Sequence, residues 1–146
     1  MEYGVMTQAH VAQIGELEQR CFSDPWSSRS IASELENPLA LWLVAEEKGV
    51  VAGYIGSQAV LGEADMLNLA VAPEYRRRGV GEQLVLRLIE LLSRQGVGSL
   101  TLEVRVSNTP AITLYEKLGF TQVGRRRNYY EKPREDAWIL RKEWAV

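Results

Sequence analysis

The sequence predicts an α/β protein of the α+β type, in which one mixed sheet carries helices on both faces. Two helical segments come first, a run of extended segments follows, and two further helical segments alternate with the last strands. The apolar spacing changes from every three or four residues to every second residue where the helices give way to strands. With 146 residues and no internal repeat or linker, the chain is expected to form one domain over residues 1–146.

The two N-terminal helices are marked by capping residues. Thr7 is expected to cap a first helix, whose apolar positions recur every three or four residues up to Cys21. Ser27 lies near the start of a second, short helix. That helix is expected to end at Asn37-Pro38, because proline disfavours a helical residue before it.

Three extended segments follow the helices. Segments 39–47 and 50–60 are rich in β-branched and aromatic residues and are joined at Gly49, which supplies turn flexibility. They are expected to form a hairpin. A third extended segment, 65–73, is closed by Pro73, which cannot continue a strand ladder.

The C-terminal half is predicted as helix, strand, helix and two strands. Segment 99–106 alternates apolar and polar residues as a strand does. The next helix is expected to have Thr109 as its cap and Pro110 at its first position, and segments 120–130 and 136–144 form the closing strands. The long helix before them has one apolar stripe, made of Val80, Leu84, Val85, Leu88, Ile89 and Leu92.

Composition excludes several classes of function. The net charge of −2 and the 46% of hydrophobic residues describe a globular protein, with no basic excess for nucleic acid and no apolar run of bilayer-spanning length. Cys21 is the only cysteine and His10 the only histidine, so neither an internal disulfide nor a Cys/His metal site is expected. The N-terminus lacks the layout of a signal peptide, and we expect a cytoplasmic protein without membrane contact.

The basic loop before the long helix has the features of an anion site. The first N–H groups of a helix lack acceptors and carry the positive end of its dipole. Gly79 and Gly81 allow a ligand to approach the backbone closely. Three neighbouring side chains add donors for phosphate oxygens: Arg76, Arg77 and Arg78. A solvated basic turn is the alternative. A P-loop and a dinucleotide fingerprint are excluded, since Leu84 stands where the latter requires glycine.

The spacing Arg76-x-x-Gly79-x-Gly81, between a strand and a helix, resembles the acetyl-coenzyme A loop of the GNAT family of N-acetyltransferases. The likeness covers nearly the whole chain and is greatest to the bacterial ribosomal-protein-alanine N-acetyltransferases. It is carried by DPWS (24–27), NLAV (68–71), LEVR (102–105), SNTPAITLYEKLGF (107–120), RRNYY (126–130) and EDA (135–137). Leu140 departs from the pattern, which has Met there. The resemblance implies the GNAT fold, with a mixed, mostly antiparallel sheet of roughly six to seven strands.

The resemblance also implies a mechanism in which an amine attacks the thioester of acetyl-CoA directly. Glu103 matches the family's general base, which is needed because a free α-amine is mostly protonated at neutral pH. Tyr115 matches the general acid that protonates the leaving thiolate. Without the resemblance, Glu103 is interpreted as an exposed carboxylate paired with an arginine, and Tyr115 as a core residue.

Contacts with acetyl-CoA follow from the same resemblance. The backbone of Leu69, Ala70 and Val71 is expected to pair with the pantetheine arm like an added strand. Asn108, left free if Thr109 is the cap, is expected to contact the cofactor. The pyrophosphate is expected to lie beside Arg76 and to be held mainly by the backbone N–H groups of Arg77, Arg78, Gly79, Val80, Gly81 and Glu82. No metal is expected.

The acceptor implied by the resemblance is a protein α-amine, the N-terminal alanine of a small-subunit ribosomal protein. It is expected to enter between Pro25-Trp26 and segment 124–136, and the enzyme is expected to be a monomer or weak dimer. One alternative is an enzyme of the same fold that acetylates a small amine, such as a polyamine or an antibiotic. Another is a catalytically silent module that binds coenzyme A or associates with the ribosome. The presence of both Glu103 and Tyr115 argues against the silent module.

Overall fold

The computed structural model describes all residues from 1 to 146. Its sheet has seven strands in the order β1-β2-β3-β4-β5-β7-β6. The strands are β1 (Glu2–Val5), β2 (Ala40–Glu47), β3 (Val50–Val60), β4 (Glu63–Val71), β5 (Ser99–Arg105), β6 (Thr121–Glu131) and β7 (Arg134–Glu143). The helices are α1 (Val11–Cys21), α2 (Ser28–Glu34), α3 (Val80–Arg94) and α4 (Thr109–Lys117), with 3-10 turns η1 (Gln8–His10) and η2 (Pro73–Tyr75).

The sheet is mixed, and only β4 and β5 pair in parallel. Such a pair needs a crossover between its strands, and α3 supplies it. All other neighbours are antiparallel, and β2 and β3 form the predicted hairpin. The predicted mixed, mostly antiparallel sheet of the GNAT fold is therefore confirmed.

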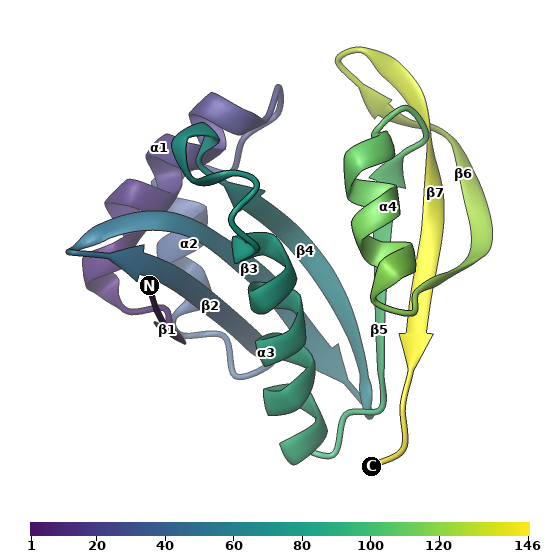
Figure 1. Ribbon diagram of the computed structural model, residues 1–146, viewed down its shortest axis with the longest axis horizontal. Helices are drawn as coiled ribbons and strands as arrows, with labels where there is room; N and C mark the ends of the chain where they lie inside the picture. The colour runs from purple at the N-terminus through teal and green to yellow at the C-terminus, as the bar shows by residue number, and fades with distance from the viewer.

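Helices cover both faces of the sheet, as predicted (Figure 1). On one face α1 and α2 pack over a cluster of 11 buried residues that includes Ile14, Ile31 and Tyr54. On the other face α3 and α4 pack over a larger cluster of 18, to which Leu88 and Tyr115 contribute. The sheet therefore has no solvent-facing side in its centre, which explains why β2 and β3 are almost continuously apolar.

The long helix α3 has the predicted apolar stripe. Its buried positions are three or four residues apart, and Ile89 is half-buried at the margin of the stripe. The helix begins at Val80, directly after Gly79. Gly96 lies just past its end with a φ of 81°, a left-handed conformation that favours glycine.

At the N-terminus the predicted cap Ser27 is present, Thr7 caps a 3-10 turn while His10 is the cap of α1 itself, and one strand was not predicted. Thr7 precedes η1, which continues into α1, and the Ser27 hydroxyl accepts the N–H of Ser30 at 3.1 Å. The second helix ends at Glu34, before the predicted stop.

Residues 2–5 form β1 at the edge of the sheet, with a single partner, β2. Four mostly exposed residues carry too little apolar alternation to mark a strand.

Candidate active site

The strands β4 and β5 lie together only at their first residues. Their ladder joins Ala64 to Leu100 and Asp65 to Thr101, and no further pair follows. Beyond Asp65, β4 is paired on one side only, by β3. Figure 1 shows β4 and β5 diverging towards their carboxyl ends. The sheet is therefore open along the second half of β4.

This opening leaves backbone groups of β4 without a partner strand. Ala72, just after β4, donates its N–H to the carbonyl of Ala52 on β3 at 2.8 Å. Successive residues of a strand point their N–H groups to opposite sides, so those of Leu69 and Val71 point away from β3, to the side where β5 has diverged. An extended ligand can add to such an edge through main-chain hydrogen bonds. The predicted contact segment 69–71 lies at this edge.

The loop that follows β4 displays a run of backbone N–H groups. Arg77 and Gly79 both have left-handed backbones, with φ of 65° and 75°. The N–H groups of residues 77–79 have no backbone acceptor, and residues 80–82 open α3, where N–H groups have no acceptor within the helix. The first bond after them runs from the N–H of Gln83 to the carbonyl of Gly79 at 3.0 Å. With the positive end of the α3 dipole, these amides suit an anion such as a diphosphate.

The three arginines of this loop have different partners. Arg76 turns back to β4, where its Nε donates to the carbonyl of Val71 at 3.1 Å. Arg78 forms an ion pair of 3.2 Å with Glu47 at the end of β2. Arg77 is exposed and makes no ion pair within the protein. Arg76 therefore fastens the loop to the open strand through a neutral carbonyl, and Arg77 is the arginine whose guanidinium has no partner within the protein.

Glu103 lies on β5, opposite Ile139 of β7. Its side chain is 25% exposed and pairs with Arg126, whose Nε lies 3.2 Å from Oε1. Burial raises the pKa of Tyr129, and the nearby charge of Glu103 raises it further. Burial, together with Tyr129, also raises the pKa of Tyr130 to about 12. An ion pair with an arginine is what a purely structural Glu103 would also form. The pair engages only Oε1, and polar and aromatic side chains surround the carboxylate.

Tyr115 points from α4 into the core that joins the two halves of the sheet. It is 6% exposed, and its ring packs edge-on against Phe120 at 5.6 Å. Its hydroxyl lies 3.7 Å from Sδ of Met66, the β4 residue directly after the last pair with β5. Burial raises the pKa of Tyr115, so the phenol stays protonated at neutral pH. The side chain is thus a core residue, and its proton has only a weak acceptor in the protein.

Asn108 caps α4, in place of the predicted Thr109. The Asn108 Oδ1 accepts the N–H of Ala111 at 3.3 Å, and Thr109 is the first residue of the helix. The expectation that Thr109 is the cap and Asn108 is free of capping is wrong. Asparagine caps at least as well as threonine, and proline is tolerated throughout the first turn, so the sequence does not fix the register of the cap. The cap leaves only Nδ2 of Asn108 for the contact that the resemblance implies.

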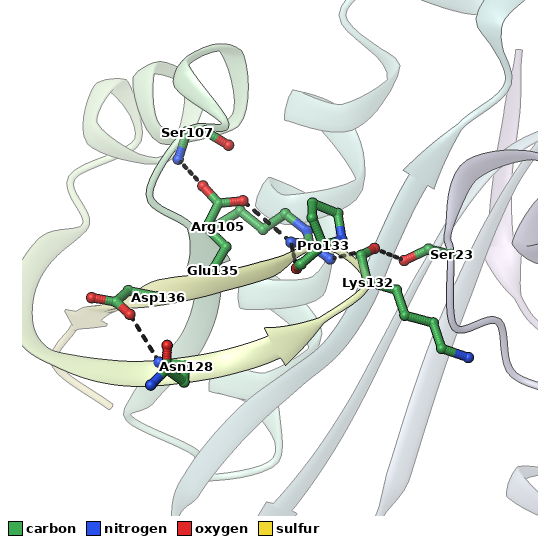
Figure 2. Close-up of polar contacts among 8 residues, drawn as sticks. All are labelled: Ser23, Arg105, Ser107, Asn128, Lys132, Pro133, Glu135 and Asp136. Carbon is green, nitrogen blue, oxygen red and sulfur yellow. Dashed lines mark hydrogen bonds and ion pairs between the residues drawn. The ribbon is translucent and has the colours of Figure 1, made fainter.

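The turn between β6 and β7 is fastened to two other parts of the molecule (Figure 2). Arg105, the last residue of β5, donates to the carbonyls of Lys132 at 3.3 Å and Pro133 at 2.9 Å. Ser23, in the loop between α1 and α2, donates its hydroxyl to the Lys132 carbonyl at 2.6 Å. The turn therefore connects the two halves of the molecule that diverge at β4 and β5. The Pro25-Trp26 segment belongs to the same α1–α2 loop.

Two adjacent carboxylates of β7 hold this end of the sheet in shape. Glu135 accepts the N–H of Ser107 at 2.8 Å and pairs with Arg105 at 3.2 Å, and hydrogen bonding with the side chain and then the backbone of Ser107 lowers its pKa. Asp136 accepts the N–H of Asn128 at 2.8 Å, which lowers the pKa of Asp136 (Figure 2). Asn128 has a φ of 51° and lies in a bulge of β6. The bulge changes the direction in which the side chains of the next two residues, Tyr129 and Tyr130, leave the strand.

Glu18 of α1 is a polar core residue that sequence reasoning missed. It is 1% exposed and accepts the N–H of Trp26 at 2.8 Å, Nδ2 of Asn68 at 3.1 and 3.0 Å, and the hydroxyl of Tyr54. Burial raises the pKa of Glu18, and these hydrogen bonds oppose the shift. A signal was present, because Glu18 follows Ile14 by four residues and so interrupts the apolar stripe of α1.

These side chains do not form a metal centre. No group of three or more His, Cys, Asp or Glu side chains is placed to hold a metal ion. None of the helices combines the length and the apolar character needed to cross a membrane. The chemistry available is that of main-chain amides, arginines, and the carboxylate and phenol of Glu103 and Tyr115.

Comparison with known proteins identifies the family. Residues 11–120 match the acetyltransferase (GNAT) family. The ribosomal protein bS18-alanine N-acetyltransferase of Escherichia coli (strain K12) is 44% identical over 126 residues, which cover 85% of this chain and 84% of that protein. The crystal structure of the ribosomal-protein-S18-alanine N-acetyltransferase from Escherichia coli superimposes with a TM-score of 0.91 and 37% identity, covering 99% of this chain and 94% of that one.

A more distant structure shares the fold alone. Arabidopsis thaliana NAA60, solved in complex with acetyl-CoA, has a TM-score of 0.87 at 16% identity and covers 97% of each chain. The family match spans more than half of the chain, and the Escherichia coli relative exceeds 40% identity over most of it. The sequence, the diverging β4 and β5 and these matches together show that the protein belongs to the GNAT family of acetyltransferases and is an acyltransferase.

Proposed function

We propose that the protein transfers the acetyl group of acetyl-CoA to the α-amine of an N-terminal alanine, and that its acceptor is a small-subunit ribosomal protein. One observation carries the proposal. The open edge of β4, with the N–H groups of Leu69 and Val71, leads directly into the unpaired amides of residues 77–82. The acceptor is taken from relatives named as ribosomal protein bS18-alanine N-acetyltransferases, whose sequences match over most of their length.

Binding of acetyl-CoA is assigned to the backbone. The open edge of β4 suits the pantetheine arm, because an extended chain of amides can hydrogen-bond there as an added strand. The amides of residues 77–82 and the unpaired guanidinium of Arg77 suit the diphosphate, because both offer donors with positive charge. A β4 N–H group that contacts the thioester carbonyl also stabilises the negative charge that develops on its oxygen during attack.

Two side chains are assigned to proton transfer. Glu103 accepts the proton that the amine loses as the new C–N bond forms, directly or through one water, and its Oε2 is not engaged by Arg126. Tyr115 donates its proton towards the sulfur as the C–S bond breaks. The phenol is protonated at neutral pH, and its weak contact with Met66 is easily exchanged for the sulfur.

The acceptor is assigned to the side of the sheet where the α1–α2 loop meets the β6–β7 turn. Tyr129 and Tyr130 lie close enough to Glu103 for its charge to raise the pKa of both. Ser23 and Lys132 join the two segments that border this region.

Acetyl transfer to a panel of amines tests the proposal. A peptide that begins with alanine should be acetylated at its α-amine, whereas the same peptide with a blocked N-terminus and an internal lysine should not. Faster turnover of a polyamine or an aminoglycoside would contradict the assigned acceptor. Mass spectrometry of ribosomal-protein N-termini, from cells with and without the protein, then identifies the natural substrate.

A further inference from the structure

The buried carboxylate of Glu18 has no role in the proton transfers described above. Each of its hydrogen-bond partners is neutral: a backbone N–H, a carboxamide and a phenol. A carboxylate is costly to bury, and burial raises the pKa of Glu18. An apolar residue or a glutamine at this position of α1 would avoid that cost. Either replacement would, however, leave one or more of the three buried donor groups without an oxygen acceptor.

Asn68 is the first partner of Glu18 that bears on function. It lies on β4 beyond Asp65, where the ladder to β5 has ended. On the other side of β4, the register with β3 shifts between Gly56 and Ser57, directly opposite Asn68. At Asn68 the strand keeps its pair with Gly56 but lacks the restraint that pairing with β5 would give. Two hydrogen bonds from Asn68 Nδ2 to Glu18, at 3.1 and 3.0 Å, replace part of that restraint.

Trp26 is the second partner. Its backbone N–H donates to Glu18 at 2.8 Å, and its ring packs edge-on against Trp42 with the centroids 5.5 Å apart. Trp26 belongs to the α1–α2 loop, which contacts the β6–β7 turn through Ser23 and Lys132. The same Oε1 of Glu18 thus contacts both the α1–α2 loop and β4.

We propose that Glu18 is a positioning residue that sets the acceptor-side loop and the acetyl-CoA-binding strand relative to each other. It fixes Asn68 directly before Leu69, whose N–H lies on the open edge, and it fixes Trp26 in the loop. The inference rests on the proposed function, because that function assigns the α1–α2 loop to the acceptor and strand β4 to acetyl-CoA. A carboxylate is required because only an acceptor with two oxygens satisfies three donor groups from three separate segments.

The variant Glu18→Gln tests this with little change in volume. Its amide still accepts the N–H of Trp26 but places a second donor against Asn68. We expect the KM for an alanine-initiated peptide and the KM for acetyl-CoA each to rise about tenfold, as for the loss of a hydrogen bond to a charged group. Asn68→Ala, which leaves the Trp26 contact intact, should raise mainly the KM for acetyl-CoA. The double variant Glu18→Gln/Asn68→Asp restores a carboxylate and carboxamide pair and should recover part of both losses.

Glu34→Gln is the matched control. Glu34 is a helix glutamate on the same face of the sheet that accepts Nε1 of Trp42 at 3.3 Å and Nδ2 of Asn37 at 3.1 Å, and it has no hydrogen bond to the α1–α2 loop or to β4. The Glu34→Gln variant should leave the KM for the peptide and the KM for acetyl-CoA unchanged. Melting temperatures are measured for every variant. If Glu18→Gln lowers the melting temperature but leaves both KM values at the wild-type level, or if the double variant recovers stability but not KM, the inference is wrong. A wild-type protein that acetylates no peptide would instead overturn the proposed function.

Discussion

Gly81→Ala is expected to weaken coenzyme A binding without weakening the fold. Gly81 is the second residue of α3, and an added Cβ would lie 3.6 Å from Cδ2 of Leu114 and 3.7 Å from Cγ2 of Val71, both ordinary contacts. Alanine is favoured over glycine within a helix by up to about 1 kcal/mol. The free energy of unfolding should therefore stay equal to that of the wild type or rise by up to about 1 kcal/mol.

The same methyl group should obstruct the ligand. It would lie between Val71 at the end of the open strand and Leu114 of α4, and we expect a ligand on β4 to pass this point on its way to the loop amides. Displacing one N–H from a phosphate oxygen removes a hydrogen bond to a charged group, which contributes about 1.5–3 kcal/mol. The dissociation constant of coenzyme A should then rise by a factor of about 10 to 150.

Titration calorimetry of coenzyme A and thermal unfolding together make the test. Gly79→Ala and Gly96→Ala form a matched pair, since both glycines have positive φ, of 75° and 81°, and open space at the Cβ position. Each alanine should destabilise the fold by about 1–2 kcal/mol through backbone strain, but only Gly79→Ala should weaken coenzyme A binding. If Gly81→Ala binds coenzyme A as tightly as the wild type, the diphosphate does not approach this stretch of backbone.

Three further predictions concern proton transfer and acid stability. Glu103→Gln should lower kcat by about 10²–10⁴-fold while the affinity for acetyl-CoA is retained, and a full rate in single-turnover assays would remove Glu103 as the base. Tyr115→Phe should lower kcat by a factor of at least about 10. It should change unfolding by at most about 1 kcal/mol, because the hydroxyl contacts only a thioether. The hydrogen bond from Arg20 is the main cause that lowers the pKa of Glu74 from 4.5 to about 2. The stability from this pair is present above pH 4.5 and lost as the pH falls towards 2, so Arg20→Ala should flatten that part of a plot of melting temperature against pH.

Periodicity and capping residues predicted most elements of the fold. The stripe of α3, the hairpin of β2 and β3 and the alternation of β5 each depend on local patterns that the sequence displays. β1 depends instead on pairing with β2, and its own residues carry no distinct signal. The cap of α4 was misassigned because Asn108 and Thr109 are both competent caps before a proline, and only the backbone decides between them.

The residues of the candidate site could be proposed from the sequence, but their arrangement could not. The glycine and arginine spacing pointed to the loop, yet the short ladder of β4 and β5 follows from tertiary packing and has no sequence signature. The different partners of Arg76, Arg77 and Arg78 could not be foreseen, because adjacent identical residues look alike in sequence. Glu18 shows the same limit. Its position on an apolar stripe is visible in the sequence, but its three partners come from distant segments that only the fold brings together.

The central claim is that main-chain amides of one strand edge and one loop bind acetyl-CoA. Backbone amide NMR spectra recorded during a coenzyme A titration test it most directly. We predict that the largest shifts and the strongest protection from hydrogen exchange fall on Leu69, Val71 and residues 77–82, with little change in β1 or the outer part of β6. Saturable binding that leaves these amides unperturbed, or no binding at all, would contradict the account.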